Sequence, residues 1–278
     1  KKIKNYFSNT TNINSNIINK EFSNFLLQTQ VDSNQKLDEE IIFNIINYFY
    51  SIGQISKSYE LIQSIDLQNS KYSSFYNKIE INYLLSTYQL EKVCSRNNRE
   101  NLDLITESYL YEKTDIFCLL IKGKLDEAEL QNSILIESEK DVDSFFQDLF
   151  NYILSNSNEI EEENKSFNIQ LNKQLVFLYS AMLRIAELPL NQDFLNLDAR
   201  NLAIPIILNF STPAEVRIRA ANQAFLNGQL SIESLAALYQ SVDFQNKEFV
   251  SFEDTILMLE NNKEKLMSFL YQYINIQI

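Results

Sequence analysis

The sequence predicts an all-α protein built of stacked helical hairpins, an α-solenoid. The chain has only 3 Gly and 3 Pro in 278 residues, so it lacks the frequent turn residues that a β-sandwich or β-barrel needs. Apolar residues recur every three or four positions, as in Ile42, Ile45, Ile46 and Phe49, which places them along one side of a helix. No segment shows the sustained alternation that is typical of a half-buried strand.

Composition divides the chain into regions. Residues 1–36 are rich in Asn, Ser and Thr and predict a loosely held N-terminal arm. Helical hairpins are expected over residues 37–157, followed by an acidic connection over 158–167. Residues 168–278 hold ten of the eleven alanines. Because alanine lets helix axes approach closely, this region is expected to form a tightly packed, Ala-rich C-terminal helical subdomain.

The three glycines each separate two helical patterns. Gly53, Gly123 and Gly228 are each followed two residues later by an aliphatic residue and then by Ser or Asp. Glycine ends a helix in the left-handed conformation, and Ser or Asp caps the next helix. The glycines lie 70 and 105 residues apart, which are two and three times 35 and indicate a 35-residue repeat. Thr212 predicts the N-cap of a helix that ends at Gly228.

In this 35-residue frame, residues 39–143 resemble the tetratricopeptide repeat. That repeat places a large apolar residue two positions after a Gly and a small residue five positions after it. The matching positions are Gly53, Ile55 and Ser58, and Gly123, Leu125 and Ala128. Tyr88 stands where the intervening Gly would be, and the early Trp and late Pro of the repeat are absent. The resemblance implies a concave surface lined by the first helix of each pair.

The resemblance also implies which residues contact a partner. The groove positions are Phe43, Asn47, Tyr50, Lys78, Asn82, Lys113 and Phe117. The Lys78 and Asn82 pair resembles the residues that hold a peptide carboxylate in some tetratricopeptide grooves. The alternative is that the lysines are solvated surface and the aromatic residues fill space between helices.

Three arginines, Arg200, Arg217 and Arg219, form a second candidate surface. Arg217 and Arg219 are two residues apart, so they point to different sides of one helix. The alternative is that each arginine pairs locally with a carboxylate such as Glu215 or Asp198.

Composition excludes several classes of site. Without His, the chain has no Ser-His-Asp system and no imidazole metal ligand. Three distant glycines cannot form a phosphate-binding loop, so no cofactor and no metal are implied. A net charge of −13 argues against nucleic acid as a partner, and no apolar run is long enough to span a bilayer. Cys118 lies in an apolar run that predicts a buried thiol, with a disulfide to Cys94 as the alternative.

The predicted function is a protein-interaction or scaffolding module that binds a peptide or a partner subunit in its groove. One alternative is a carboxylate-dependent enzyme acting on glycans, or its helical accessory domain, with Glu187 and Glu107 as candidate acids. The other is a structural piece of a larger envelope protein. The first residue is Lys1, so we expect sequence to be missing upstream. The compartment stays open, cytoplasmic or, after removal of a signal peptide, periplasmic or exported.

Overall fold

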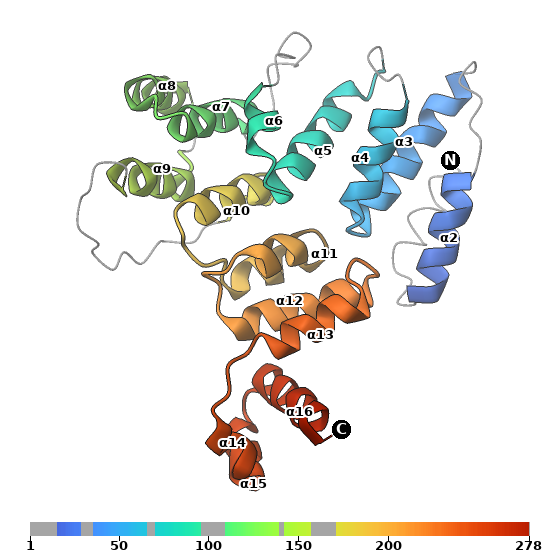
Figure 1. Cartoon of the computed structure of the whole chain (residues 1–278). Coiled ribbons are helices and arrows are strands. Elements are labelled where there is room, and N and C mark those ends of the chain that lie inside the picture. The colour runs from blue at the N-terminus through green and yellow to red at the C-terminus, as the bar shows by residue number, and fades with distance from the viewer. Residues whose placement is uncertain are drawn as a thin grey trace. The chain divides into compact units, whose positions relative to one another are not determined.

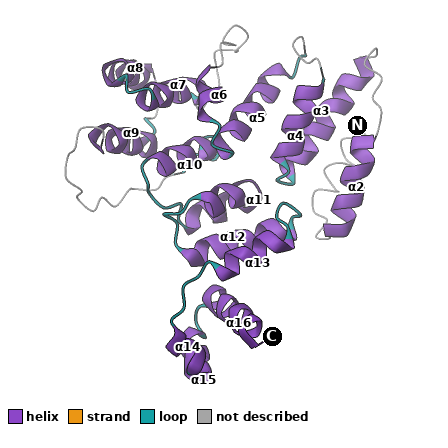
Figure 2. Ribbon diagram, viewed as in Figure 1, coloured by secondary structure: helices purple, strands orange, loops and turns teal. Residues whose placement is uncertain are grey.

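The computed structural model describes residues 16–28, 36–65, 70–95, 109–138, 142–156 and 171–277. Throughout these ranges the regular structure is helical and contains no strand, which confirms the all-α prediction (Figure 2). None of the helices in these ranges is long and apolar enough to cross a membrane. The chain forms two compact units, unit 1 from residues 1–54 and 191–278 and unit 2 from residues 55–190.

Unit 2 is built around one buried helix. Its helices are α4 (Ile55–Ser64), α5 (Ser73–Ser86), α6 (Leu90–Ser95), α7 (Leu110–Ile121), α8 (Leu125–Ser138), α9 (Ser144–Asn156) and α10 (Val176–Ile185) (Figure 1). Each helix from α4 to α7 packs against the next one, and α10 packs against α5, α7 and α9. Every residue from Val176 to Leu183 is buried, because α10 is apolar around most of its circumference and can be covered on every side.

The chain makes the same turn at three positions that are 35 residues apart, and again at Gly228. Gly53, Tyr88 and Gly123 have left-handed backbones, with φ of 84°, 60° and 70°. In each turn the next residue's N–H donates to a carbonyl five residues earlier, at 2.8 to 3.0 Å, which satisfies the helix end. The helices that follow begin at Ile55, Leu90 and Leu125. The interval seen in the sequence therefore coincides with a repeated backbone geometry, and Tyr88 adopts the conformation expected of glycine.

A disulfide joins α6 to α7. Cys94 and Cys118 are bonded, with an S–S distance of 1.98 Å and a separation of 24 residues. The predicted free thiol at Cys118 is therefore wrong, although the residue is buried as expected. The sequence pattern could not show this, because the bond depends on how α6 and α7 come together.

Unit 1 combines N-terminal and C-terminal segments. Its helices are α2 (Asn16–Gln28), α3 (Lys36–Ser51), α11 (Gln192–Leu208), α12 (Ala214–Leu226), α13 (Ile232–Gln240), α14 (Asn246–Val250), α15 (Phe252–Leu259) and α16 (Lys263–Gln277). The contact between α11 and α12 is extensive. Four alanines with no exposed surface lie on these two helices, Ala203, Ala220, Ala221 and Ala224, where small side chains allow close approach.

The Gln229 side chain holds the two parts of unit 1 together. Its amide nitrogen donates to the carbonyl oxygens of Gly53 and Arg200, the latter at 2.8 Å. The Arg200 guanidinium donates in turn to the Ser51 carbonyl oxygen at 3.3 Å. A Cβ on Gly53 would lie 2.6 Å from the Arg200 carbonyl oxygen, so glycine is required here by space as well as by φ.

The start of the helix before Gly228 differs from the sequence prediction. The helix before Gly228 begins with Pro213 as its N-cap, without a side-chain capping bond. The predicted N-cap Thr212 is buried instead.

The predicted acidic connection, residues 158–167, lies outside the described residues, as does much of the predicted arm. By residue contacts, the boundaries between the two units fall after Gln54 and before Asn191. The predicted boundaries, at residues 37, 157 and 168, follow composition instead.

Candidate functional site

Three of the predicted groove residues are interior. Asn82 on α5 and Lys113 and Phe117 on α7 are 1%, 1% and 0% exposed. The chain's own helix α10 packs against both α5 and α7. These three side chains therefore contribute to the core of unit 2 and offer no surface to a partner.

Lys113 is held by a carboxylate of the same chain. Its Nζ lies 3.0 Å from Asp143 Oδ2, and the Tyr179 hydroxyl of α10 donates to the same oxygen at 2.7 Å. Asp143 also caps α9, because its Oδ1 accepts the Phe146 N–H at 3.0 Å. The Phe146 ring lies 5.4 Å from the Lys113 ammonium, within the range of a cation–π interaction. Asp143 thus supplies the counter-charge of Lys113 from within the same chain.

The other groove residues keep some surface. Lys78 on α5 is half-buried, and burial lowers the pKa of its ammonium. Asn47 on α3 is exposed, and Phe43 and Tyr50 on the same helix are half-buried. These three residues of α3 belong to unit 1, and the other four belong to unit 2. For the residues with exposed surface, a role in partner binding stays a prediction.

Each of the three arginines bonds a different acceptor within unit 1. Arg200 bonds the Ser51 carbonyl, and Arg217 Nε donates to the Ile207 carbonyl at 3.0 Å. Burial lowers the pKa of Arg217. Arg219 pairs with a carboxylate 45 residues away, since its Nε lies 2.8 Å from Glu264 Oε1.

The predicted local partners of these arginines are engaged elsewhere. Glu215 bonds Lys265 at 2.7 Å, and this hydrogen bond lowers the pKa of Glu215. Asp198 accepts hydrogen bonds from the backbone and side-chain amides of Asn201. The local pairing of Arg217 or Arg219 with Glu215 is therefore wrong, because Lys265 of α16 takes Glu215 and Glu264 of α16 takes Arg219.

Of the two candidate catalytic acids, Glu187 lacks the surroundings that acid catalysis needs. Glu187 is exposed at the end of α10, in a left-handed conformation with φ of 54°. An acid catalyst of the glycosidase type needs an apolar pocket that raises its pKa, and an exposed helix end is a different environment. Glu107 lies outside the described residues. In the ranges that the structure describes, no group of three or more His, Cys, Asp or Glu side chains could hold a metal ion.

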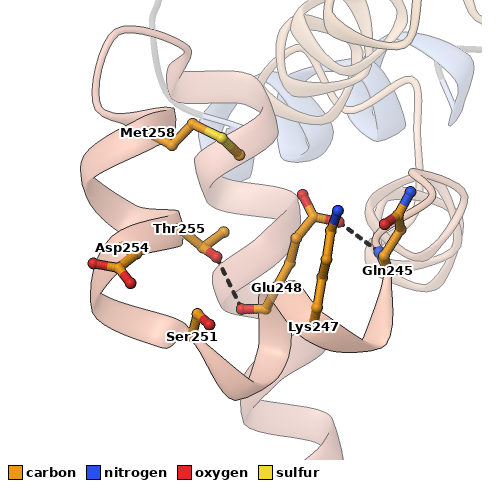
Figure 3. Close-up of a pocket in the computed structure, with 7 residues that line it drawn as sticks. All are labelled: Gln245, Lys247, Glu248, Ser251, Asp254, Thr255 and Met258. Atoms are coloured by element: carbon orange, nitrogen blue, oxygen red, sulfur yellow. Dashed lines mark hydrogen bonds between the residues drawn. The ribbon is translucent and has the colours of Figure 1, made fainter.

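A shallow hollow of about 370 Å³ lies between α14 and α15 (Figure 3). Two hydrogen bonds fix its frame. The Thr255 hydroxyl donates to the Glu248 carbonyl oxygen at 2.9 Å, and Glu248 Oε2 accepts the Gln245 N–H at 2.5 Å. The other lining residues are Lys247, Ser251, Asp254 and Met258.

Apolar side chains are exposed at and beside this hollow. Met258 is 66% exposed, and its neighbour Leu257 is 65% exposed. Lys247 and Asp254 are exposed as well, so the site offers an ammonium and a carboxylate beside apolar surface. A signal existed in the sequence, because the run Ile256 to Leu259 is apolar throughout. One face of a short helix cannot bury four consecutive residues.

Comparison with family models, with curated proteins and with solved structures finds no match to this chain.

Proposed function

We propose that this chain is a helical-repeat protein-interaction module. Three equivalent turns at 35-residue intervals support the resemblance of residues 39–143 to tetratricopeptide repeats. Repeats of this kind serve as binding scaffolds because neighbouring units supply extended surfaces.

The partner is bound at the α14–α15 hollow rather than through the interior residues of α5 and α7. The observation that carries this assignment is the exposure of Leu257 and Met258 next to a hollow with a hydrogen-bonded frame. Exposed apolar side chains that line a concave, partly polar surface are typical of interaction sites. Met258 can adapt to the shape of an apolar partner side chain, while Lys247 and Asp254 can bond the partner's polar groups.

The two alternatives have less support. Nothing in the surroundings of Glu187 favours acid catalysis on glycans, because the residue is exposed at a helix end. A purely structural role in a larger envelope protein has no specific contact among the described helices to support it.

The test compares the parent chain with a Leu257→Ser/Met258→Ser variant as baits in cell extract. The control variant, Leu226→Ser/Ile232→Ser, removes two apolar side chains of similar exposure in the same unit. We expect a protein that the parent and the control retain and the α15 variant does not. Its purified form should then bind the α15 variant about tenfold or more weakly than the parent, the usual loss for two contact residues at an interface. Equal retention by all three baits, or by none, would contradict binding at the hollow.

A further inference from the structure

One face of helix α8 in unit 2 is buried against α7 and α9. Ala128, Asn132 and Leu135 are buried, and their spacing of four and three residues places them on one side of the helix. α8 packs against α7. The Asn132 amide exchanges two hydrogen bonds with the Gln147 amide of α9, at 2.7 and 2.9 Å. The core of unit 2 thus uses one side of α8 only.

The opposite side of α8 carries apolar residues in water. Leu130 and Ile134 are 64% and 59% exposed and are four residues apart, so they are neighbours on the helix surface. Leu130 follows the buried Ala128 by two residues, which turns it about 200° around the axis, away from the core. Asp126 precedes this pair by one turn, and Glu137 follows it by one turn. Both carboxylates are exposed. We call Asp126, Leu130, Ile134 and Glu137 the outer face of α8.

The exposed charged side chains of α8 are all carboxylates. Asp126, Glu127, Glu129 and Glu137 are all exposed. The adjacent cation, Lys124, is already bonded to Glu127 at 2.9 Å. The outer face therefore presents an apolar pair between carboxylates, which complements an apolar stripe between cations.

From this complementarity we propose that the outer face of α8 docks a basic amphipathic helix of a partner protein. Its apolar residues cover Leu130 and Ile134, and its lysines or arginines pair with Asp126 and Glu137. A second copy of this chain is a poor occupant, because a symmetric contact would bring the same carboxylates together. An anionic membrane surface is repelled for the same reason. This interaction is independent of the α14–α15 hollow, which lies in the other unit.

The experiment uses the whole chain and a fluorescent synthetic peptide as the probe. The peptide has about 14 residues, roughly four helical turns, with leucines on one face and lysines on the other. Binding is followed by fluorescence anisotropy at about 0.05 M and 0.3 M NaCl, since salt screens the charge contribution. A second peptide with glutamates in place of the lysines reports on binding without charge complementarity.

Two variants probe the outer face, and one serves as a matched control. We expect Leu130→Ser/Ile134→Ser to weaken binding of the lysine peptide at least about tenfold. Asp126→Asn/Glu137→Gln should weaken it about three- to tenfold at low salt and less at high salt. The control, Leu226→Ser/Ile232→Ser, removes two equally exposed apolar residues of unit 1 that belong to neither proposed surface and should leave the affinity unchanged. Circular dichroism checks that each variant is as helical as the parent.

Each other result overturns the proposal. Equal affinity of the parent and the Leu130→Ser/Ile134→Ser variant would show that the peptide binds elsewhere, as would a loss confined to the Leu226→Ser/Ile232→Ser control. Equal binding of the glutamate peptide would remove the role of charge. Sedimentation velocity tests whether a second copy of the chain binds the outer face. If the parent dimerises and the Leu130→Ser/Ile134→Ser variant does not, the outer face is an interface between two copies of this chain. A negative result in these assays does not affect the proposal that the α14–α15 hollow binds a partner, because the bait experiment tests that surface separately.

Discussion

The ion pair of Lys113 and Asp143 allows a sharp test of the core of unit 2. We expect Asp143→Asn to destabilise the protein by about 3–5 kcal/mol, because it leaves a buried ammonium without its counter-charge. The two side chains are 2% and 10% exposed, so water cannot replace the lost partner. Asparagine has the size of aspartate and can still accept the Phe146 N–H bond, so the change removes the charge and keeps the cap.

The two further variants of this pair separate charge from contact. Lys113→Met should cost less, about 1–3 kcal/mol, because Asp143 keeps its bonds from Tyr179 and Phe146 and reaches water in part. The double variant Lys113→Met/Asp143→Asn removes both charges of this pair. It should therefore be more stable than Asp143→Asn alone by about 2 kcal/mol or more.

Urea unfolding followed by far-ultraviolet circular dichroism measures these differences. A loss of about 3 kcal/mol moves the midpoint by roughly 1 M at the slope usual for proteins of moderate size. Asp126→Asn is the matched control, since it makes the same chemical change at an exposed site of the same unit and should cost under about 0.5 kcal/mol. A loss below about 1 kcal/mol for Asp143→Asn, or a double variant no more stable than it, would refute the buried pair.

Three further outcomes are expected. Gly123→Ala should cost about 1 kcal/mol for its left-handed backbone, and Gly53→Ala roughly 1–3 kcal/mol more, because its Cβ also meets a carbonyl oxygen; equal midpoints in urea would contradict this difference. The hydrogen bond from the α12 guanidinium lowers the pKa of Glu264 from its ordinary 4.5, so the pair adds stability above that pH and loses it as pH falls through the lower, folded-state pKa. Glu264→Gln should thus cost about 0.2–1 kcal/mol at neutral pH and progressively less in thermal scans at pH values below about 4, whereas a constant deficit would be inconsistent with this pKa. Reduction of the Cys94–Cys118 disulfide, 24 residues apart, should cost about 3 kcal/mol, and an unchanged unfolding midpoint in reductant would count against the bond.

The helices and turns were predictable because they depend on local sequence. The spacing of Gly53 and Gly123 located two turns of the 35-residue frame, and the third proved to have the same geometry with Tyr88 in it. A non-glycine residue in this conformation costs about 1 kcal/mol or more. The Arg184 guanidinium lies 4.1 Å from the centre of the Tyr88 ring, a contact that offsets part of that cost. A purely glycine-based search would therefore miss this turn.

The candidate site was less predictable, because burial depends on distant segments. The positions of Lys113 and Phe117 in a repeat frame place them on one side of α7, but the frame does not say which segment covers that side. The cover comes from α10 and from Asp143, which is 30 residues beyond Lys113. The disulfide escaped prediction for a similar reason, since the spacing of Cys94 and Cys118 matches no redox or metal motif. Contacts between segments decide both outcomes, and one sequence carries little signal for them.

Three arginines of unit 1 are engaged in contacts within the chain. Arg200 and Arg217 bond carbonyl oxygens within unit 1, and Arg219 bonds Glu264. These cations are thus bound internally, while the carboxylates that flank the exposed apolar residues of α8 and α15 face water. With a net charge of −13, the chain attracts cationic partners at long range and repels acidic ones. In the two proposed sites the exposed apolar residues act only at contact, so we expect charge to select the class of partner and apolar burial to hold it.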